Sequence, residues 1–97
     1  MAEEGGNNSG HQIFINATVH DKEVRISCGN GSQRIKWLGH VAIARYDEEL
    51  YQGWKVLGVP VHMEKMETGE PLMLGAVIKD ILVDGDRVKV DTSIDPR

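Results

Sequence analysis

Two segments in which hydrophobic and polar residues alternate, 12–19 and 23–28, come early in the chain. Both contain β-branched residues, and each places its hydrophobic residues on one face, as a half-buried strand does. The hydrophobic positions are Ile13, Ile15 and Ala17 in the first segment, and Val24, Ile26 and Cys28 in the second. Only the polar segment 20–22 separates the two. The pattern therefore predicts two antiparallel strands joined as a hairpin.

A period of about 3.6 residues replaces this alternation after Gly29-Asn30-Gly31. Ser32 is a residue type that accepts hydrogen bonds from the free N–H groups of a first helical turn, so we expect a helix over residues 33–48. Trp37 and His40 fall outside the apolar stripe of this helix and should point away from the sheet. The stripe itself consists of Ile35, Leu38, Val41, Ala42, Ile43, Tyr46 and Leu50.

The second half of the chain is predicted to return to strands. The residues 54–57 follow a glycine and are mostly apolar, which indicates a third strand, and 61–63 indicate a short fourth. Residues 72–82 have no clean period, so we expect a short helical turn with flanking loop there. Asp84-Gly85-Asp86 is typical of a tight turn, and the alternation that follows predicts a last strand over 86–92.

A hairpin, a helix and further strands predict an α+β domain: a mixed sheet of four to five strands with one main helix packed across one face. This order, the opening Gln12-Ile13-Phe14-Ile15 and the closing Asp-Gly-Asp-Arg-Val-Lys-Val at 84–90 resemble the ubiquitin-like β-grasp superfamily. The resemblance covers roughly residues 12–92. Residues 1–11, which offer almost nothing to bury, and residues 93–97 are expected to be tails of this one domain.

Composition and charge exclude several function classes. The 97 residues provide one hydrophobic core, and 11 basic against 15 acidic residues, without a Lys/Arg cluster, argue against a nucleic-acid partner. No stretch approaches the roughly 18 apolar residues of a membrane span. The lone Cys28 has no partner for an internal disulfide, which favours a cytoplasmic or nuclear location. We therefore expect another protein as the partner, no cofactor, and a monomer.

No group of residues has the sequence spacing of a catalytic or metal centre. The four histidines lie at positions 11, 20, 40 and 62. None has another His or Cys at metal-ligand spacing. Asp84 and Asp86 are too few ligands for Ca²⁺, and Cys28 is expected to be a buried apolar residue. The segment 29–32 lacks the Gly-Lys-Ser/Thr ending of a phosphate-binding loop. We expect a chain without catalytic activity.

The resemblance implies two modes of action: covalent attachment through a C-terminal Gly-Gly, or non-covalent recognition of other proteins. The sequence ends with Thr92-Ser93-Ile94-Asp95-Pro96-Arg97, which contains no Gly-Gly. We therefore expect a non-catalytic protein–protein interaction module of ubiquitin-like type. Two alternatives stay open: a small modifier or sulfur carrier whose Gly-Gly lies beyond residue 97, and a regulatory β-grasp domain of a larger enzyme.

Exposed apolar side chains with a polar rim are the usual anchors of such recognition. The apolar patch of ubiquitin lies on outward positions of the third and last strands, but here the last strand carries the charged Lys89 and Asp91 at those positions. The candidates that remain lie on the outer side of the helix and in segment 54–57. The predicted partner-binding residues are Trp37, His40, Trp54, Val56 and Leu57.

Overall fold

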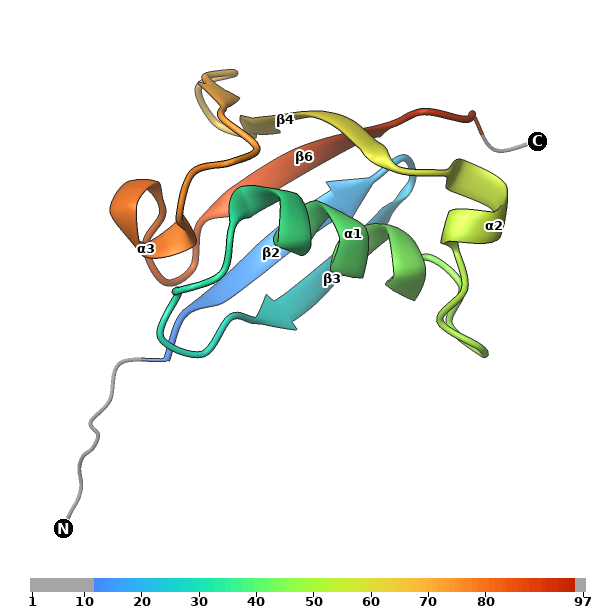
Figure 1. Ribbon diagram of the computed structural model, residues 1–97, viewed down its shortest axis with the longest axis horizontal. Helices are drawn as coiled ribbons and strands as arrows, with labels where there is room; N and C mark the ends of the chain where they lie inside the picture. The colour runs from blue at the N-terminus through green and yellow to red at the C-terminus, as the bar shows by residue number, and fades with distance from the viewer. Residues whose placement is uncertain (1–11, 96–97) are drawn as a thin grey trace, which may run out of the picture.

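A mixed sheet with one main helix across it forms the fold of residues 12–95, which are the residues that the computed structural model describes (Figure 1). The sheet order is β3-β2-β6-β4-β5, in which β2 and β6 run parallel and the other neighbours antiparallel. The predicted α+β sheet with a helix on one face is confirmed. The elements are β2 (Phe14–Val19), β3 (Lys22–Ser27), α1 (Ile35–Arg45), α2 (Trp54–Leu57), β4 (Pro60–Lys65), β5 (Pro71–Leu72), α3 (Ile78–Ile81) and β6 (Arg87–Thr92).

The core lies between α1 and one face of the sheet. The predicted hairpin is confirmed, with Ile15 of β2 opposite Ile26 of β3. Full burial of an aliphatic side chain contributes about 1.5–3 kcal/mol. The inward-facing side chains of the strands and the apolar stripe of α1 therefore stabilise the packing of the helix on the sheet. The buried residues of these elements are Ile15, Ala17, Val19, Ile26, Met63, Val88 and Val90 from the strands, and Ile35, Leu38, Ala42 and Ile43 from α1.

The start of α1 is capped by a distant loop. The helix begins at Ile35 and no side chain caps its first turn, so the prediction that Ser32 does so is wrong. The Ser32 N–H instead donates to Asn30 Oδ1 at 3.1 Å. The N–H groups of the first two helical residues donate to the carbonyls of Ala76 and Leu74, both at 2.8 Å. These carbonyls satisfy donors that a local capping residue would otherwise serve.

The end of α1 comes earlier than predicted. The helix ends at Arg45, and a loop leads from there to α2. Within the predicted stripe, Val41 and Tyr46 are half-buried against the core. Leu50 lies in the loop and is 70% exposed, so its place in the buried stripe is wrong.

Residues 54–57 form the short helix α2, so the predicted third strand is wrong. The Leu57 N–H donates to the carbonyl of Gly53 at 2.9 Å, which closes one helical turn. Gly58, at φ +79°, then reverses the chain in a conformation that favours glycine. The predicted strand at 61–63 is confirmed as part of β4. The third strand along the chain is thus β4, the segment after α2.

The acidic turn before β6 is anchored by both of its carboxylates. Gly85 has φ +90°, as a tight turn requires. The Phe14 N–H donates to Asp84 Oδ1 at 2.8 Å, and the Val83 N–H donates to Asp86 Oδ2 at 2.9 Å. The predicted turn, the last strand and the helical turn within 72–82, which is α3, are confirmed. No helix within residues 12–95 is long and apolar enough to cross a membrane.

Candidate functional site

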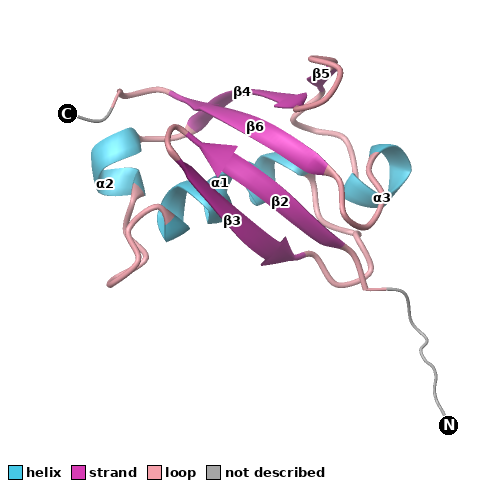
Figure 2. Ribbon diagram, turned by 180° about the vertical axis from the view of Figure 1, so that it is seen from behind, coloured by secondary structure: helices cyan, strands magenta, loops and turns pink. Residues whose placement is uncertain are grey.

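The face of the sheet that α1 leaves uncovered is polar, and Figure 2 looks onto it. On β6, Lys89 and Asp91 occupy the outward positions, as predicted, with Lys89 Nζ 3.9 Å from Asp91 Oδ1. Phe14 is half-buried, and the Arg25 guanidinium covers its ring at 4.2 Å from the centroid. The outward positions of β6 on this face are therefore charged, and the ring of Phe14 on β2 is covered.

Many of the exposed apolar side chains belong to the segment 50–59, which contains α2, and to the segment after β6 that is hydrogen-bonded to it. Figure 1 shows α2 at one end of the molecule. Trp54 is the largest of them and is 52% exposed. On small domains such a concentration of apolar surface marks a site of interaction with another molecule. We call the following residues the α2 surface: Leu50, Tyr51, Trp54, Val56, Val59 and Ile94.

Backbone hydrogen bonds join the two chain segments that form the α2 surface. The Ile94 N–H donates to the Leu57 carbonyl at 3.0 Å. The Ser93 N–H donates to the Val59 carbonyl at 2.9 Å, and the Val59 N–H donates back to Ser93 Oγ at 3.0 Å. The segment after β6 is thereby fixed beside α2. The surface is held in place before any partner binds.

The structure separates the five residues predicted to bind a partner. Trp54 and Val56 lie on the α2 surface. Leu57 is fully buried in the core and is not available to a partner, which corrects its inclusion among the surface residues. Trp37 is half-buried and packs against the core from α1, and His40 on the same helix is also half-buried. The helix's outer side is therefore not continuous with the α2 surface through exposed apolar residues.

The other members of the α2 surface were not predicted. Leu50 was placed on the buried stripe because the helical period was extended past Arg45. Tyr51, Val59 and Ile94 lie in loops, where side-chain exposure has no sequence period. An available signal was the pair of glycines that flank 54–57, since glycines at both ends of a short apolar run are also typical of an isolated helical turn.

The loop between α1 and α2 is held by the Asp47 carboxylate. Asp47 Oδ1 accepts the N–H groups of Glu49 at 3.1 Å and Leu50 at 3.4 Å, and Oδ2 accepts that of Gln52 at 3.4 Å. The bond from Glu49 is the main reason that the pKa of Asp47 lies below its ordinary value. Tyr51 in this loop has φ +56°, which is unfavourable for a residue with a side chain. The three bonds hold it there.

Asp47→Asn should destabilise the chain at neutral pH, because an amide is a weaker acceptor for these N–H groups. A carboxyl pKa that is lower in the folded state gives stability above its ordinary value of 3.8, and this stability is lost as the pH falls through the folded-state pKa. The difference in unfolding free energy between wild type and Asp47→Asn should therefore shrink in acid. Urea denaturation at a series of pH values measures it, and a difference independent of pH would contradict the role of the carboxylate.

An open, mainly acidic depression of about 450 Å³ borders the α2 surface. Lys22 is its one basic lining residue, and its Nζ is already engaged, 3.2 Å from Glu48 Oε2 and 3.0 Å from the Tyr46 carbonyl. Three carboxylates thus face one lysine beside the exposed Val56. The depression favours a cationic group next to an apolar one. Its lining residues are Lys22, Tyr46, Asp47, Glu48, Glu49 and Val56.

Other groups that could carry chemistry have structural contacts. Cys28 is buried, and burial raises its pKa to about 11, so its thiol stays protonated near neutral pH and is a poor nucleophile. His20 Nε2 is hydrogen-bonded to Thr92 Oγ1 at 2.8 Å. His62 Nε2 lies 3.1 Å from Glu64 Oε1 on the open face of the sheet.

The architecture is that of ubiquitin-like domains. Among solved structures, the chain is similar to the EccD5 ubiquitin-like domain from Mycobacterium xenopi, with a TM-score of 0.57 and 16% identity, over 88% of this chain and 98% of that one. The scan against protein-family models and the search of the curated proteins found no match. At this identity the likeness shows the fold alone, and it confirms the predicted ubiquitin-like β-grasp fold.

Proposed function

We propose that this chain is a non-catalytic, ubiquitin-like protein–protein interaction module that binds its partner through the α2 surface. The observation that carries the proposal is the group of exposed apolar side chains on α2 and the segments beside it, whereas the outward positions of β6 are charged. Tryptophan and tyrosine are enriched among the residues that dominate binding energy. Trp54 and Tyr51 are both more than half exposed, and we assign Trp54 as the main anchor.

The chemistry of the partner follows from the acidic depression beside Val56. A partner that places an apolar side chain against Trp54 and a Lys or Arg in the depression would satisfy both features. Because the carboxylates are exposed, this second contact should weaken as ionic strength rises. The partner is therefore a protein segment that combines apolar and basic residues.

Rigidity of the α2 surface supports the same proposal. Leu57 fixes α2 in the core, and the Ile94 N–H bond to its carbonyl fixes the adjoining segment. A surface that is ordered in advance loses less conformational entropy on binding, so more of the contact energy appears as affinity.

A peptide library displayed on phage and selected on the full chain tests the proposal. The selected peptides should combine basic and apolar residues, and Trp54→Ala should weaken their binding at least tenfold, equivalent to about 1.4 kcal/mol. Met73→Ala is the matched control, because Met73 is an apolar side chain with 78% exposure that lies outside the α2 surface. Isothermal titration calorimetry gives both affinities.

Thermal melts must show that both variants stay folded. Unchanged affinity in a folded Trp54→Ala variant, or selection of acidic peptides, would contradict the proposal. Equal losses in Trp54→Ala and Met73→Ala would do the same.

A further inference from the structure

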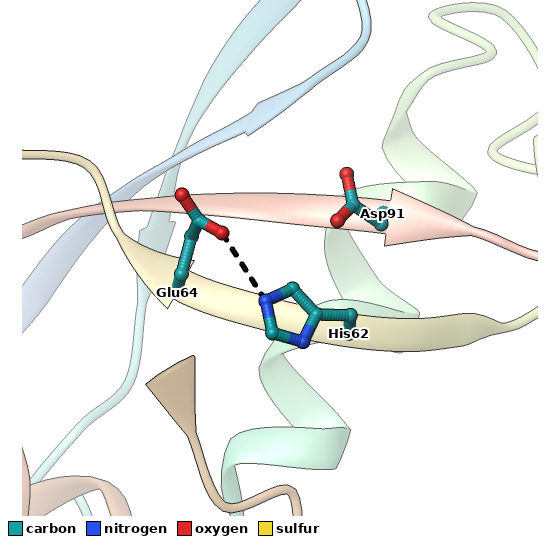
Figure 3. A group of neighbouring side chains, drawn as sticks. All are labelled: His62, Glu64 and Asp91. Atoms are coloured by element: carbon teal, nitrogen blue, oxygen red, sulfur yellow. Dashed lines mark hydrogen bonds and ion pairs between the residues drawn. The ribbon is translucent and has the colours of Figure 1, made fainter. Parts of the chain in front are cut away.

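His62, Glu64 and Asp91 stand together on the open face of the sheet, the first two on β4 and the third on the adjacent β6 (Figure 3). His62 and Glu64 are two residues apart and so share a face of the strand. His62 also pairs directly with Asp91 across the antiparallel ladder. One ligand atom from each residue lies within 4.8 Å of the other two. We propose that these three side chains bind one divalent transition-metal ion, with Zn²⁺ as the best fit.

The distances suit a small ion. Zn²⁺ binds nitrogen and oxygen at about 2.0–2.2 Å, so two ligand atoms on a tetrahedral ion lie about 3.4 Å apart. His62 Nε2 and Glu64 Oε1 are 3.1 Å apart, which is close to that value. A carboxylate oxygen of Asp91 lies within 4.8 Å of both of these atoms and must move closer to complete the site. The hydrogen-bonded ladder between β4 and β6 keeps the three backbone positions fixed.

The donor set favours particular metals. One imidazole with two carboxylates suits Zn²⁺ and neighbouring transition metals, whereas Mg²⁺ and Ca²⁺ prefer oxygen ligands alone. His62 is exposed and the two carboxylates are half-buried, so a bound ion would keep a coordination position open to water or to a side chain of another molecule. The two carboxylates offset the charge of the ion.

The positive charge of Lys89 should weaken metal binding at this site, which can be tested by substitution. Its Nζ lies 3.9 Å from Asp91 Oδ1, and Lys89 is paired with Glu64 across the ladder. This cation opposes the arrival of a second one and competes for a carboxylate ligand. The site should therefore bind weakly in the wild type and more tightly when the lysine is replaced by a neutral residue.

Titration of the ¹⁵N-labelled full chain with Zn²⁺, followed by NMR of the histidine side chains and by calorimetry, tests the proposal. One Zn²⁺ should bind per chain with the largest shifts at His62, and excess Mg²⁺ should not displace it. His62→Ala and Asp91→Asn should each weaken binding at least tenfold. Lys89→Gln should strengthen it several-fold, while His20→Ala should leave it unchanged.

All four substitutions lie at exposed or half-buried positions, and circular dichroism checks that each variant is folded. Absence of a shift at His62, or binding that survives His62→Ala, would overturn the proposal. Binding that depends on His62 but ignores Asp91→Asn and Lys89→Gln would show a lone surface imidazole and would overturn it as well. The site shares no residue with the α2 surface, so either proposal can fail without the other.

Discussion

Leu57→Ala should lower the free energy of unfolding by about 2–5 kcal/mol, as removal of a fully buried leucine side chain does. Leu57 has no accessible surface and holds α2 against the core. The neighbouring substitution Val56→Ala should change the unfolding free energy by no more than about 0.5 kcal/mol, because Val56 is 51% exposed. Urea denaturation of the wild type and the two variants measures these differences. The dependence of the unfolding free energy on urea concentration should be similar in all three.

Leu57 and Val56 distinguish a residue that stabilises the fold from one that contacts a partner. Val56→Ala should weaken binding of the selected peptides while the fold stays intact, since its side chain belongs to the α2 surface. Similar losses of stability in both variants would place Val56 in the core and contradict the assignment of that surface.

Gly53→Ala should destabilise the chain by at least the roughly 1–3 kcal/mol typical of overpacking. A Cβ at this position would collide with the carbonyl oxygen of Ile43 and come within 3.1 Å of Tyr46 Cβ. The first obstacle is backbone, so no change of rotamer relieves it and α2 must move away from α1. The φ of Gly53 is −58°, so the requirement for glycine here is close approach and not an unusual backbone conformation.

Gly75→Ala is the matched control, because a Cβ there would meet nothing within 4 Å. Its stability should stay near that of the wild type. Thermal melts of both variants, with amide chemical shifts of residues 54–59 as a local readout, test the prediction. Equal stability of the two variants would show that α2 does not pack against the end of α1.

Local patterns were sufficient for most of the fold. Ile15 and Ala17 lie in a strand long enough for alternation to be read, and the Asp-Gly-Asp turn has a strong conformational preference of its own. Segment 54–57 is too short for a period to distinguish strand from helix. Contacts with remote residues, among them Ile94, then fix its position in the fold, and the sequence does not show them.

In the candidate sites too, residue type could be read from the sequence, whereas tertiary contacts could not. Trp54 and Val56 could be predicted from residue type. Trp37 was also predicted to bind a partner, but tertiary packing, which the sequence does not show, half-buries it against the core. The expectation of no metal centre rested on spacing along the chain. A register shift between Pro60 and His62 sets which residue of β6 lies opposite the histidine, and only the paired sheet brings Asp91 to it.

The most direct test of the central claim is an NMR titration of the ¹⁵N-labelled chain with one of the selected basic and apolar peptides. If the α2 surface is the binding site, the largest amide shift changes will map to residues 50–59 and to Ile94, and β6 will change little. Changes centred on Lys89 and Asp91, with residues 50–59 unaffected, would contradict it.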